Sequence, residues 1–221
     1  MPSFLPEPCI IQSRVISKDI CNEIIELGYN STKIDFGMIG GGDDGHEEHR
    51  TRKSGVGWLD RNATLSDGKT VFDHITPIVR DVNAESFKFD LNYHESYQFT
   101  IYTAPDEHYE WHCDGHFVPY SEEDCKNDPD IEERVGGYRK LSYSLNLTDP
   151  NEYEGGHFEW CDAYGVNPLN DPERAVMRAP QSGREQGTLI VFPSFLYHRV
   201  TPVTHGRRHS LVGWIAGPTF R

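Results

Sequence analysis

Two histidines and one aspartate have the residue types and the spacing of a metal centre. His112 and Asp114 lie two positions apart, and His198 follows 84 residues after Asp114. On a β-strand, residues i and i+2 point to the same face, so we expect the imidazole and the carboxylate to converge. Two histidines and one carboxylate on one side of a metal leave its opposite positions open, which is typical of a non-haem Fe(II) centre that activates O₂.

An arginine ten residues after His198 adds a second chemical feature. Arg208 follows Arg207 in segment 207–210. A guanidinium group can bind a carboxylate through two parallel hydrogen bonds, so it suits a dicarboxylate co-substrate. Because consecutive residues of a strand point to opposite faces, only one of the two arginines can face a given pocket.

Other groups of metal-ligand residues carry less weight. A His-x-Asp pair alone occurs by chance in many chains, and a satisfied surface pair is its ordinary interpretation. Residues 37–50 contain His46, Glu47 and His49, but this glycine-rich acidic stretch indicates a solvated loop, which is a poor rigid ligand set. The alternative interpretation of this loop is a lid over an active site.

The chain changes character near residue 85, from helical periodicity to short alternating segments. A helix is expected to begin at Lys18, after Ser17 as its N-cap, and to stop at Gly28. A second helix is expected over residues 69–83. Alternating or apolar segments predict strands at 87–93, 97–102, 141–147, 157–160, 188–192 and 210–215. Short strands with Gly and Pro turns indicate an antiparallel sandwich or jelly roll.

Composition limits the classes of partner. The 221 residues are 36% hydrophobic and 12% aromatic, which is enough for a sizeable core. The net charge of −14 repels a phosphate backbone, so nucleic acid is disfavoured apart from a small basic patch at Arg50, Arg52 and Lys53. Five cysteines without a Cys-x-x-Cys pair indicate free thiols. With no secretion signal and no long apolar run, we expect a soluble cytoplasmic protein.

Several segments together resemble the 2-oxoglutarate/Fe(II)-dependent dioxygenases, and within them the prolyl-4-hydroxylase-like and PKHD-type hydroxylases. The resemblance begins with Tyr102, ten residues before His112, and continues through residues 139–147 and the Gly155-Gly156 turn. It is most specific in segments 187–193 and 198–210. It covers residues 87–217, whereas residues 1–85 match the family only loosely.

The resemblance implies a fold and a role for each residue. The fold would be a double-stranded β-helix, a cupin-like jelly roll, in a single domain over residues 1–221. Its catalytic core would span residues 87–217, with residues 1–85 as helical support and lid loop. Fe(II) would be bound by His112, Asp114 and His198. The distal carboxylate of 2-oxoglutarate would be held by Arg208 and would accept a hydrogen bond from the phenol of Tyr102.

Neighbouring residues have alternative assignments. Arg207 is the alternative to Arg208, which is favoured by its position six residues before Trp214. Ser210 shares a strand face with Arg208 and either assists it or is an ordinary strand serine. Cys113 is expected to point to the opposite face from the ligands and to be buried. Arg139 either reaches the pocket or forms an ion pair at a sheet edge.

The implied reaction is the hydroxylation of a carbon centre, with release of succinate and CO₂ from 2-oxoglutarate and O₂. The substrate would be a prolyl residue in a peptide or protein, or a free small molecule. L-ascorbate is a common accessory in the family. Halogenating relatives carry a small residue in place of the carboxylate ligand, so Asp114 favours hydroxylation. The oligomeric state is not indicated.

Two other classes of function stay open. One is a non-catalytic jelly roll that binds a metal or a small ligand, although such a protein need not keep all of His112, Asp114, His198 and Arg208. The other is a zinc hydrolase, because two histidines and an aspartate also form an acceptable zinc set. A zinc hydrolase leaves Arg208 unexplained. A nucleic-acid demethylase of the same superfamily is disfavoured by the net charge.

Overall fold

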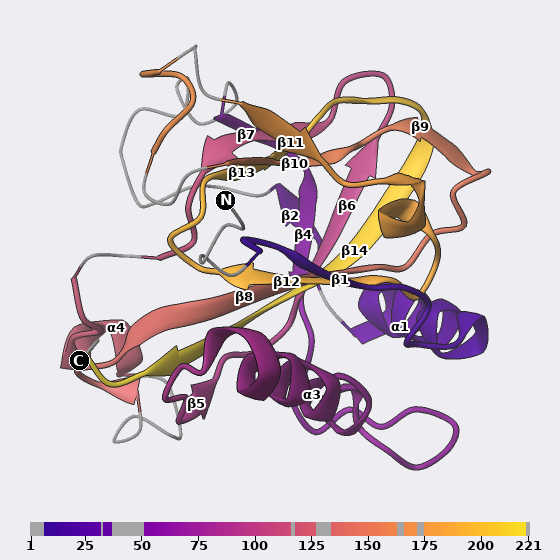
Figure 1. Ribbon diagram of the computed structural model, residues 1–221. Coiled ribbons are helices and arrows are strands. Elements are labelled where there is room, and N and C mark those ends of the chain that lie inside the picture. The colour runs from indigo at the N-terminus through magenta and orange to yellow at the C-terminus, as the bar shows by residue number, and fades with distance from the viewer. Residues whose placement is uncertain are drawn as a thin grey trace.

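The computed structural model describes residues 7–31, 33–36, 51–115, 118–126, 134–162, 166–171 and 175–219. Two antiparallel sheets lie one above the other, and helices α1 (Lys18–Ser31) and α3 (Val71–Val82) lie outside the larger sheet (Figure 1). The architecture confirms the predicted mainly β fold with flanking helices.

The larger sheet is organised around one long strand, β14 (Val203–Gly217). Within the described residues it has nine strands, and its main path runs β1-β12-β8-β14-β6-β4-β2, while β5 and β9 also pair with β14. The other strands of this sheet are β1 (Ile10–Gln12), β2 (Asp35–Phe36), β4 (Gly55–Trp58), β5 (Tyr93–His94), β6 (Gln98–Thr103), β8 (Tyr138–Asn146), β9 (Tyr153–Gly155) and β12 (Leu189–Pro193). The strands predicted at 97–102, 141–147, 188–192 and 210–215 lie in β6, β8, β12 and β14.

The smaller sheet contributes the opposite wall of the molecule. Its path over the described residues is β11-β10-β13-β7-β3. These strands are β3 (Arg52–Lys53), β7 (His108–His112), β10 (Phe158–Cys161), β11 (Val176–Arg178) and β13 (His198–Val200). Because β7 and β13 are neighbours, His112 and His198 occupy paired positions. The strand predicted at 157–160 corresponds to β10.

Two apolar clusters stabilise this arrangement. One lies between the helices and the larger sheet, and it contains Ile24 of α1, Ile75 of α3 and Leu211 of β14. The other joins the two sheets through Phe192 of β12 and Phe158 of β10, whose ring centroids lie 5.2 Å apart. The candidate ligand His198 lies next to this second cluster, so core packing fixes its surroundings.

The helices follow their apolar periodicity. Helix α3 has a capping box in which Thr70 and Asp73 exchange hydrogen bonds, and its buried face includes Ile75 and Val79. Ser17 caps α1 as predicted, because its hydroxyl accepts a hydrogen bond from the amide of Ile20 at 3.3 Å. Short helical segments occur at η1 (Asn83–Phe87), α4 (Glu122–Cys125) and η2 (Gln181–Arg184). No helix among the described residues combines the length and apolar character needed to cross a membrane.

The prediction that α1 stops at Gly28 is wrong. The helix continues to Ser31, and Gly28 lies inside it. A Cβ atom at Gly28 would lie 2.5 Å from Cδ1 of Phe99. The glycine is therefore required by the close approach of α1 to β6, a contact that local sequence cannot indicate.

The strand predicted over residues 87–93 is also wrong. Residues 83–87 form the π-helical turn η1, and only Tyr93 and His94 pair with β14. The side chain of Asn83 donates to the carbonyl of Phe89 and accepts from its amide, both at 3.0 Å. These bonds satisfy the backbone groups of Phe89, which then do not need a neighbouring strand.

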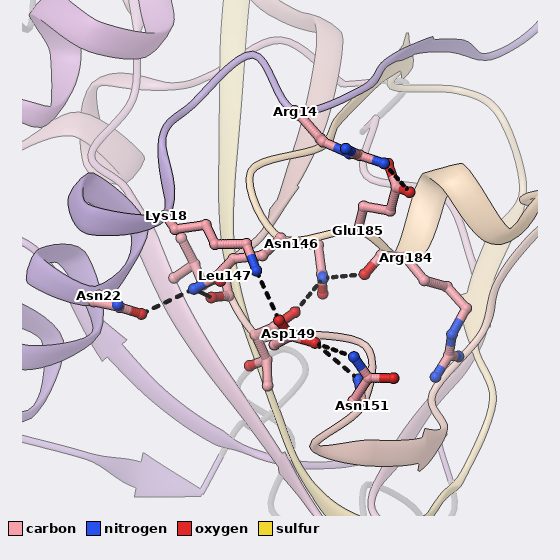
Figure 2. Close-up of polar contacts among 11 residues, drawn as sticks. Arg14, Lys18, Asn22, Asn146, Leu147, Asp149, Asn151, Arg184 and Glu185 are labelled. Atoms are coloured by element: carbon pink, nitrogen blue, oxygen red, sulfur yellow. Dashed lines mark hydrogen bonds and ion pairs between the residues drawn. The ribbon is translucent and has the colours of Figure 1, made fainter.

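A polar network joins α1 to the ends of β8 and η2 (Figure 2). Lys18 forms an ion pair with Asp149 at 2.9 Å, and Asn146 donates to the carbonyl of Arg184 at 2.6 Å. Arg14 binds Glu185 through two hydrogen bonds of 2.6 Å. These contacts hold the N-terminal segment against the end of the larger sheet, next to the Gly155-Gly156 turn.

Candidate metal centre

The structure brings together the three residues that the sequence predicts as ligands. His112 is the last residue of β7, and His198 is the first of β13. One nitrogen or oxygen atom from each of His112, Asp114 and His198 lies within 4.8 Å of the others. Nε2 of His112 is 3.6 Å from Oδ1 of Asp114, and Nε2 of His198 is 3.7 Å from Oδ2. The spacing suits one cation between the three side chains.

Asp114 reaches this position by a different route from the one predicted. Strand β7 ends at His112, so Asp114 does not share a strand face with it. The chain turns instead, and the amide of Gly115 donates to the carbonyl of Ser194 at 2.7 Å. A Cβ atom at Gly115 would lie 3.2 Å from the same carbonyl oxygen. The close backbone approach therefore positions the carboxylate.

The same turn overturns the prediction for Cys113. Cys113 is half-buried rather than buried, and the residue lines the cavity beside the ligands. All five cysteines are free thiols. Trp111 and Trp214 are both buried, and Trp214 also lines the cavity.

Backbone carbonyls fix the orientation of both imidazoles. Nδ1 of His112 lies 2.7 Å from the carbonyl oxygen of Glu110, and Nδ1 of His198 lies 3.0 Å from that of Leu196. A carbonyl only accepts, so each Nδ1 carries the proton and each Nε2 presents a lone pair. The two lone pairs are therefore available on the side where Asp114 lies.

The electrostatics of the site also fit a cation. Burial, followed by the neighbouring His198, lowers the pKa of His112 to about 3, so its ring is neutral. Burial acts to raise the pKa of Asp114, but its two histidine neighbours, the charge of Arg139 and a hydrogen bond from Ser142 outweigh that effect, and the net shift is downward. Oδ2 of Asp114 is buried and has no hydrogen-bond partner among the described residues. A buried, ionised carboxylate with a free oxygen and two neutral nitrogens is a suitable ligand set for a divalent metal.

Aromatic rings hold the imidazoles in place. The Tyr109 ring stacks on His112 with centroids 3.4 Å apart and planes at 11°. Phe192 lies 4.6 Å from the His198 ring, between centroids. This packing restricts rotation of both histidines and surrounds the site with apolar surface.

The structure separates the two candidate arginines. Arg208 is buried on β14, opposite Tyr102 of β6, and its guanidinium carbon lies 5.6 Å from the Tyr102 ring centroid. Its Nη1 donates to Oγ of Ser210 at 3.4 Å. Arg207 points to the outer face, where it donates to the hydroxyl of Tyr29 at 3.2 Å. Of the two arginines, only Arg208 shares a face of β14 with Ser210, which lines the cavity beside the candidate ligands.

A cavity of about 320 Å³ connects these features. Its walls include the three candidate ligands, Tyr102 and Ser210 beside Arg208, and other residues of both sheets. Arg139 contacts this cavity and also forms the predicted ion pair, with Nη2 at 2.6 Å from Oε2 of Glu95. The cavity is also lined by Arg52, Trp58, Gln98, Tyr102, Tyr109, Phe158, Phe192, Val200, Ser210, Val212 and Trp214.

Sequence reasoning missed Arg52 and Gln98. Arg52 was assigned to a surface basic patch, but it is 7% exposed and lines the cavity. Gln98 lies four residues before Tyr102 on β6, so strand alternation could have placed it on the same face. The predicted lid over residues 37–50, with His46, Glu47 and His49, lies outside the described residues.

Known sequences match the part of the chain that contains the three candidate ligands. Residues 97–216, just over half of the chain, match the family model of the 2OG-Fe(II) oxygenase superfamily. A PKHD-type hydroxylase of Janthinobacterium sp. (strain Marseille) is 32% identical over 111 residues, which cover 49% of this chain and 38% of that protein. A PKHD-type hydroxylase of Prochlorococcus marinus (strain NATL2A) is 29% identical over 167 residues, with coverages of 76% and 61%. The chain therefore spans less than two thirds of the length of these relatives.

Solved structures share the fold at low sequence identity. A prolyl-4-hydroxylase from Pseudomonas putida superposes with a TM-score of 0.63 at 16% identity, over 96% of this chain and 94% of that chain. A prolyl hydroxylase from Trichoplax adhaerens, solved with a hypoxia inducible factor peptide fragment, gives 0.62 at 14% identity, over 95% and 83%. These likenesses confirm the predicted jelly-roll fold.

Proposed function

Because the chain belongs to the 2OG-Fe(II) oxygenase superfamily, we propose that it is a hydroxylase that couples oxidation of a substrate C–H bond to the decarboxylation of 2-oxoglutarate. The observation that carries the proposal is the convergence of His112, Asp114 and His198 within 4.8 Å beside a cavity. In balanced form, the substrate, O₂ and 2-oxoglutarate give the hydroxylated substrate, succinate and CO₂.

The proposed ligands of Fe(II) are Nε2 of His112, Nε2 of His198 and the carboxylate of Asp114. Bound there, the iron would supply the activation of O₂ that the hydroxylation requires. The Nδ1 hydrogen bonds to backbone carbonyls keep both Nε2 atoms aimed at one point. The retained carboxylate of Asp114 supports hydroxylation rather than halogenation.

Arg208 is proposed to hold the distal carboxylate of 2-oxoglutarate. Within the described residues it forms no ion pair, so its charge is available to a ligand. Burial raises the pKa of Tyr102, which therefore stays protonated and can donate to the same carboxylate. Ser210 accepts from Arg208 and keeps its own hydroxyl proton for a third hydrogen bond.

The remaining cavity walls have two roles in this proposal. Phe158, Phe192 and Val200 line the cavity beside His198 and limit the access of water to the reacting groups. Trp58 is 50% exposed and lies across the cavity wall from Trp214, with ring centroids 6.0 Å apart. These two rings therefore mark the side from which a substrate enters.

For the substrate, we propose a prolyl residue of a peptide or a free small molecule. The names of the PKHD-type relatives and the shared fold with prolyl hydroxylases support the prolyl alternative. We further propose that L-ascorbate sustains repeated turnover. Both proposals are tested by measuring succinate formation with and without each candidate substrate, and with and without L-ascorbate.

The first experiment separates binding from turnover. Fe(II) and then 2-oxoglutarate are added to the protein without oxygen, and the weak visible absorption of the pair is recorded. Oxygen is then admitted, and succinate is measured with prolyl peptides and free amino acids. We expect the absorption in wild type and in His205→Ala, an exposed control on β14, and its loss in His198→Ala.

The outcomes distinguish the three candidate functions. Absorption followed by succinate supports the hydroxylase. Absorption without succinate under every condition favours a non-catalytic metal-binding jelly roll. Hydrolysis of a test ester with Zn(II), combined with no absorption on adding 2-oxoglutarate to the Fe(II) protein, favours the zinc hydrolase and contradicts the proposal.

A further inference from the structure

One cavity-lining arginine has no role in the proposed co-substrate site. Arg52 on β3 is 7% exposed. Its Nε donates to Oγ of Ser54 at 2.8 Å, and its Nη2 donates to Oε1 of Gln98 at 2.8 Å. Both acceptors are neutral. Within the part of the chain that is described, Arg52 forms no ion pair and its Nη1 forms no hydrogen bond.

A buried guanidinium without an anion is unfavourable, because the protein interior solvates a charge poorly. Arg139 provides a comparison within the same cavity. Arg139 lines it too, but Nε and Nη2 of Arg139 bind the two oxygens of Glu95 at 2.7 and 2.6 Å. The charge of Arg139 is therefore compensated, whereas that of Arg52 is left for a ligand. An unpaired buried cation is also unexpected in a chain with a net charge of −14.

Arg52 lies close to the candidate metal centre. Its guanidinium carbon is 4.6 Å from the centroid of the Tyr109 ring. The same ring stacks on His112 at 3.4 Å between centroids. Arg52 and the proposed iron ligand His112 therefore contact the same Tyr109 ring.

Arg52 and Arg208 are associated with different residues of β6. Arg208 pairs with Tyr102 on β6, whereas Arg52 is bound to Gln98 on the same strand. The two β6 residues are four positions apart, which corresponds to about 13 Å along a strand. Gln98 pairs with Trp58, which is half exposed, so Arg52 is bound at the open side of the cavity. Arg52 and Arg208 therefore have different hydrogen-bond partners, and each keeps N–H groups of its own for an anion.

We propose that Arg52 binds a carboxylate of the molecule that is hydroxylated, so that the substrate class is carboxylate-bearing. This inference rests on the proposed hydroxylase function. Nη1 and the remaining N–H of Nη2 donate to the carboxylate, while Ser54 and Gln98 hold the guanidinium plane. The carboxylate belongs either to a free amino acid or to an acidic residue of a peptide.

Gln98 offers a nearly isosteric test of this proposal. In Gln98→Glu, a carboxylate replaces the amide oxygen that accepts from Nη2 of Arg52. The new charge neutralises Arg52 without removing it. We expect Gln98→Glu to raise the melting temperature and to lose the binding of substrate carboxylates. A purely structural Arg52 would give the first effect without the second.

Binding is measured on the anaerobic Fe(II) and 2-oxoglutarate complex, where no turnover occurs. The probes are matched pairs: L-amino acids, including proline, against their carboxamides, and blocked Ala-Pro-Asp against blocked Ala-Pro-Asn. Dissociation constants are read by calorimetry. We expect at least one carboxylate probe to bind about tenfold tighter than its amide, as one charge-assisted contact allows. The probe pair that shows the difference identifies the source of the carboxylate.

Variants assign the preference to Arg52. Arg52→Gln and Gln98→Glu are expected to abolish the difference within each pair while the 2-oxoglutarate absorption persists. Lys53→Gln is the matched control, because Lys53 is the next residue of β3 and pairs with Asp106 at 2.6 Å on the exposed side. It is expected to keep the difference. If Arg52→Gln does not fold, as circular dichroism would reveal, Gln98→Glu carries the test.

Three results would overturn the inference. The first is an absence of carboxylate preference across the panel in a protein that shows the 2-oxoglutarate absorption. The second is a preference that survives in Gln98→Glu and Arg52→Gln. The third is loss of the 2-oxoglutarate absorption in Arg52→Gln but not in Arg208→Gln, which would make Arg52 the co-substrate residue. Failure of the hydroxylase proposal itself is distinct, because wild type would then show either no absorption or absorption without succinate under every condition.

Discussion

A Cβ atom on Gly156 would lie 3.0 Å from Cδ of Arg208. Gly156 also has φ of +58°, a backbone conformation that glycine adopts without a steric penalty. The turn at Gly156 therefore leaves room for the Arg208 side chain as it runs toward Tyr102. This close approach, together with Cγ2 of Val203 at 2.9 Å, explains in physical terms why a glycine occupies this position.

Gly156→Ala is expected to weaken 2-oxoglutarate binding by about tenfold, because a displaced guanidinium loses part of a charge-assisted hydrogen bond. Iron affinity should be unchanged. The measurement is a 2-oxoglutarate titration of the anaerobic Fe(II) absorption. The control is Gly68→Ala, since Gly68 has φ of +81° but a Cβ atom there would meet no atom within 4 Å. Equal effects in the two variants would exclude the displacement of Arg208 as the cause.

Arg208→Ala is expected to raise the 2-oxoglutarate requirement by about 10- to 100-fold, the range for loss of a hydrogen bond to a charged group. Arg207→Ala is the matched control, because Arg207 points outward to Tyr29. Succinate formation is measured against 2-oxoglutarate concentration at saturating Fe(II). A normal requirement in Arg208→Ala together with a raised one in Arg207→Ala would transfer the role to Arg207.

Asp114→Ala is expected to lose turnover while the fold persists. The metal-free variant should melt at the same temperature as wild type or higher, because it lacks a buried carboxylate whose Oδ2 is unpaired. Metal at about 100 times its dissociation constant should stabilise wild type by about 2.7 kcal/mol and leave the variant unaffected. Melting curves with and without Fe(II) or Mn(II) test this. Asp106→Ala, an exposed substitution, should behave as wild type, and full activity in Asp114→Ala would remove Asp114 from the ligand set.

Residue types and the alternation of side chains along a strand were sufficient to predict part of the site. The residue types of His112, Asp114 and His198 predicted which side chains would meet, since few sets of residues can bind iron in this way. Alternation on β14 correctly separated Arg208 from Arg207, because neighbouring residues of a strand must face opposite sides. Their roles as ligands stay predictions.

Contacts between distant segments explain what the sequence could not indicate. Asp114 is placed by a hydrogen bond between Gly115 and Ser194, and not by strand alternation. Arg52 lies on a two-residue strand, and its acceptor Gln98 is 46 positions away. Gly28 was expected to end a helix, but tertiary packing on Phe99 decides its role. In each case the deciding partner lies far along the chain, where local pattern carries no information.

Acid lability follows from a buried histidine outside the metal centre. His94 is 8% exposed, its Nδ1 lies 2.6 Å from the carbonyl of Glu95, and its Nε2 is bonded to the hydroxyl of Tyr143. Burial lowers its pKa to about 4, whereas an unfolded histidine has a pKa of about 6.5. Between these values the unfolded chain binds a proton that the folded chain does not. The free energy of unfolding must therefore fall as the pH falls from about 6.5 to about 4.

The size of this effect is measurable between pH 6.5 and pH 5, where most carboxylates stay ionised in both states. We expect His94 to account for a loss of roughly 1–2 kcal/mol over this range. Urea unfolding of the metal-free protein at several pH values gives the slope. His94→Gln should be less stable at pH 7 but should lose less stability on acidification, whereas His205→Gln, at an exposed position, should follow wild type. An unchanged slope in His94→Gln would show that other groups cause the pH dependence.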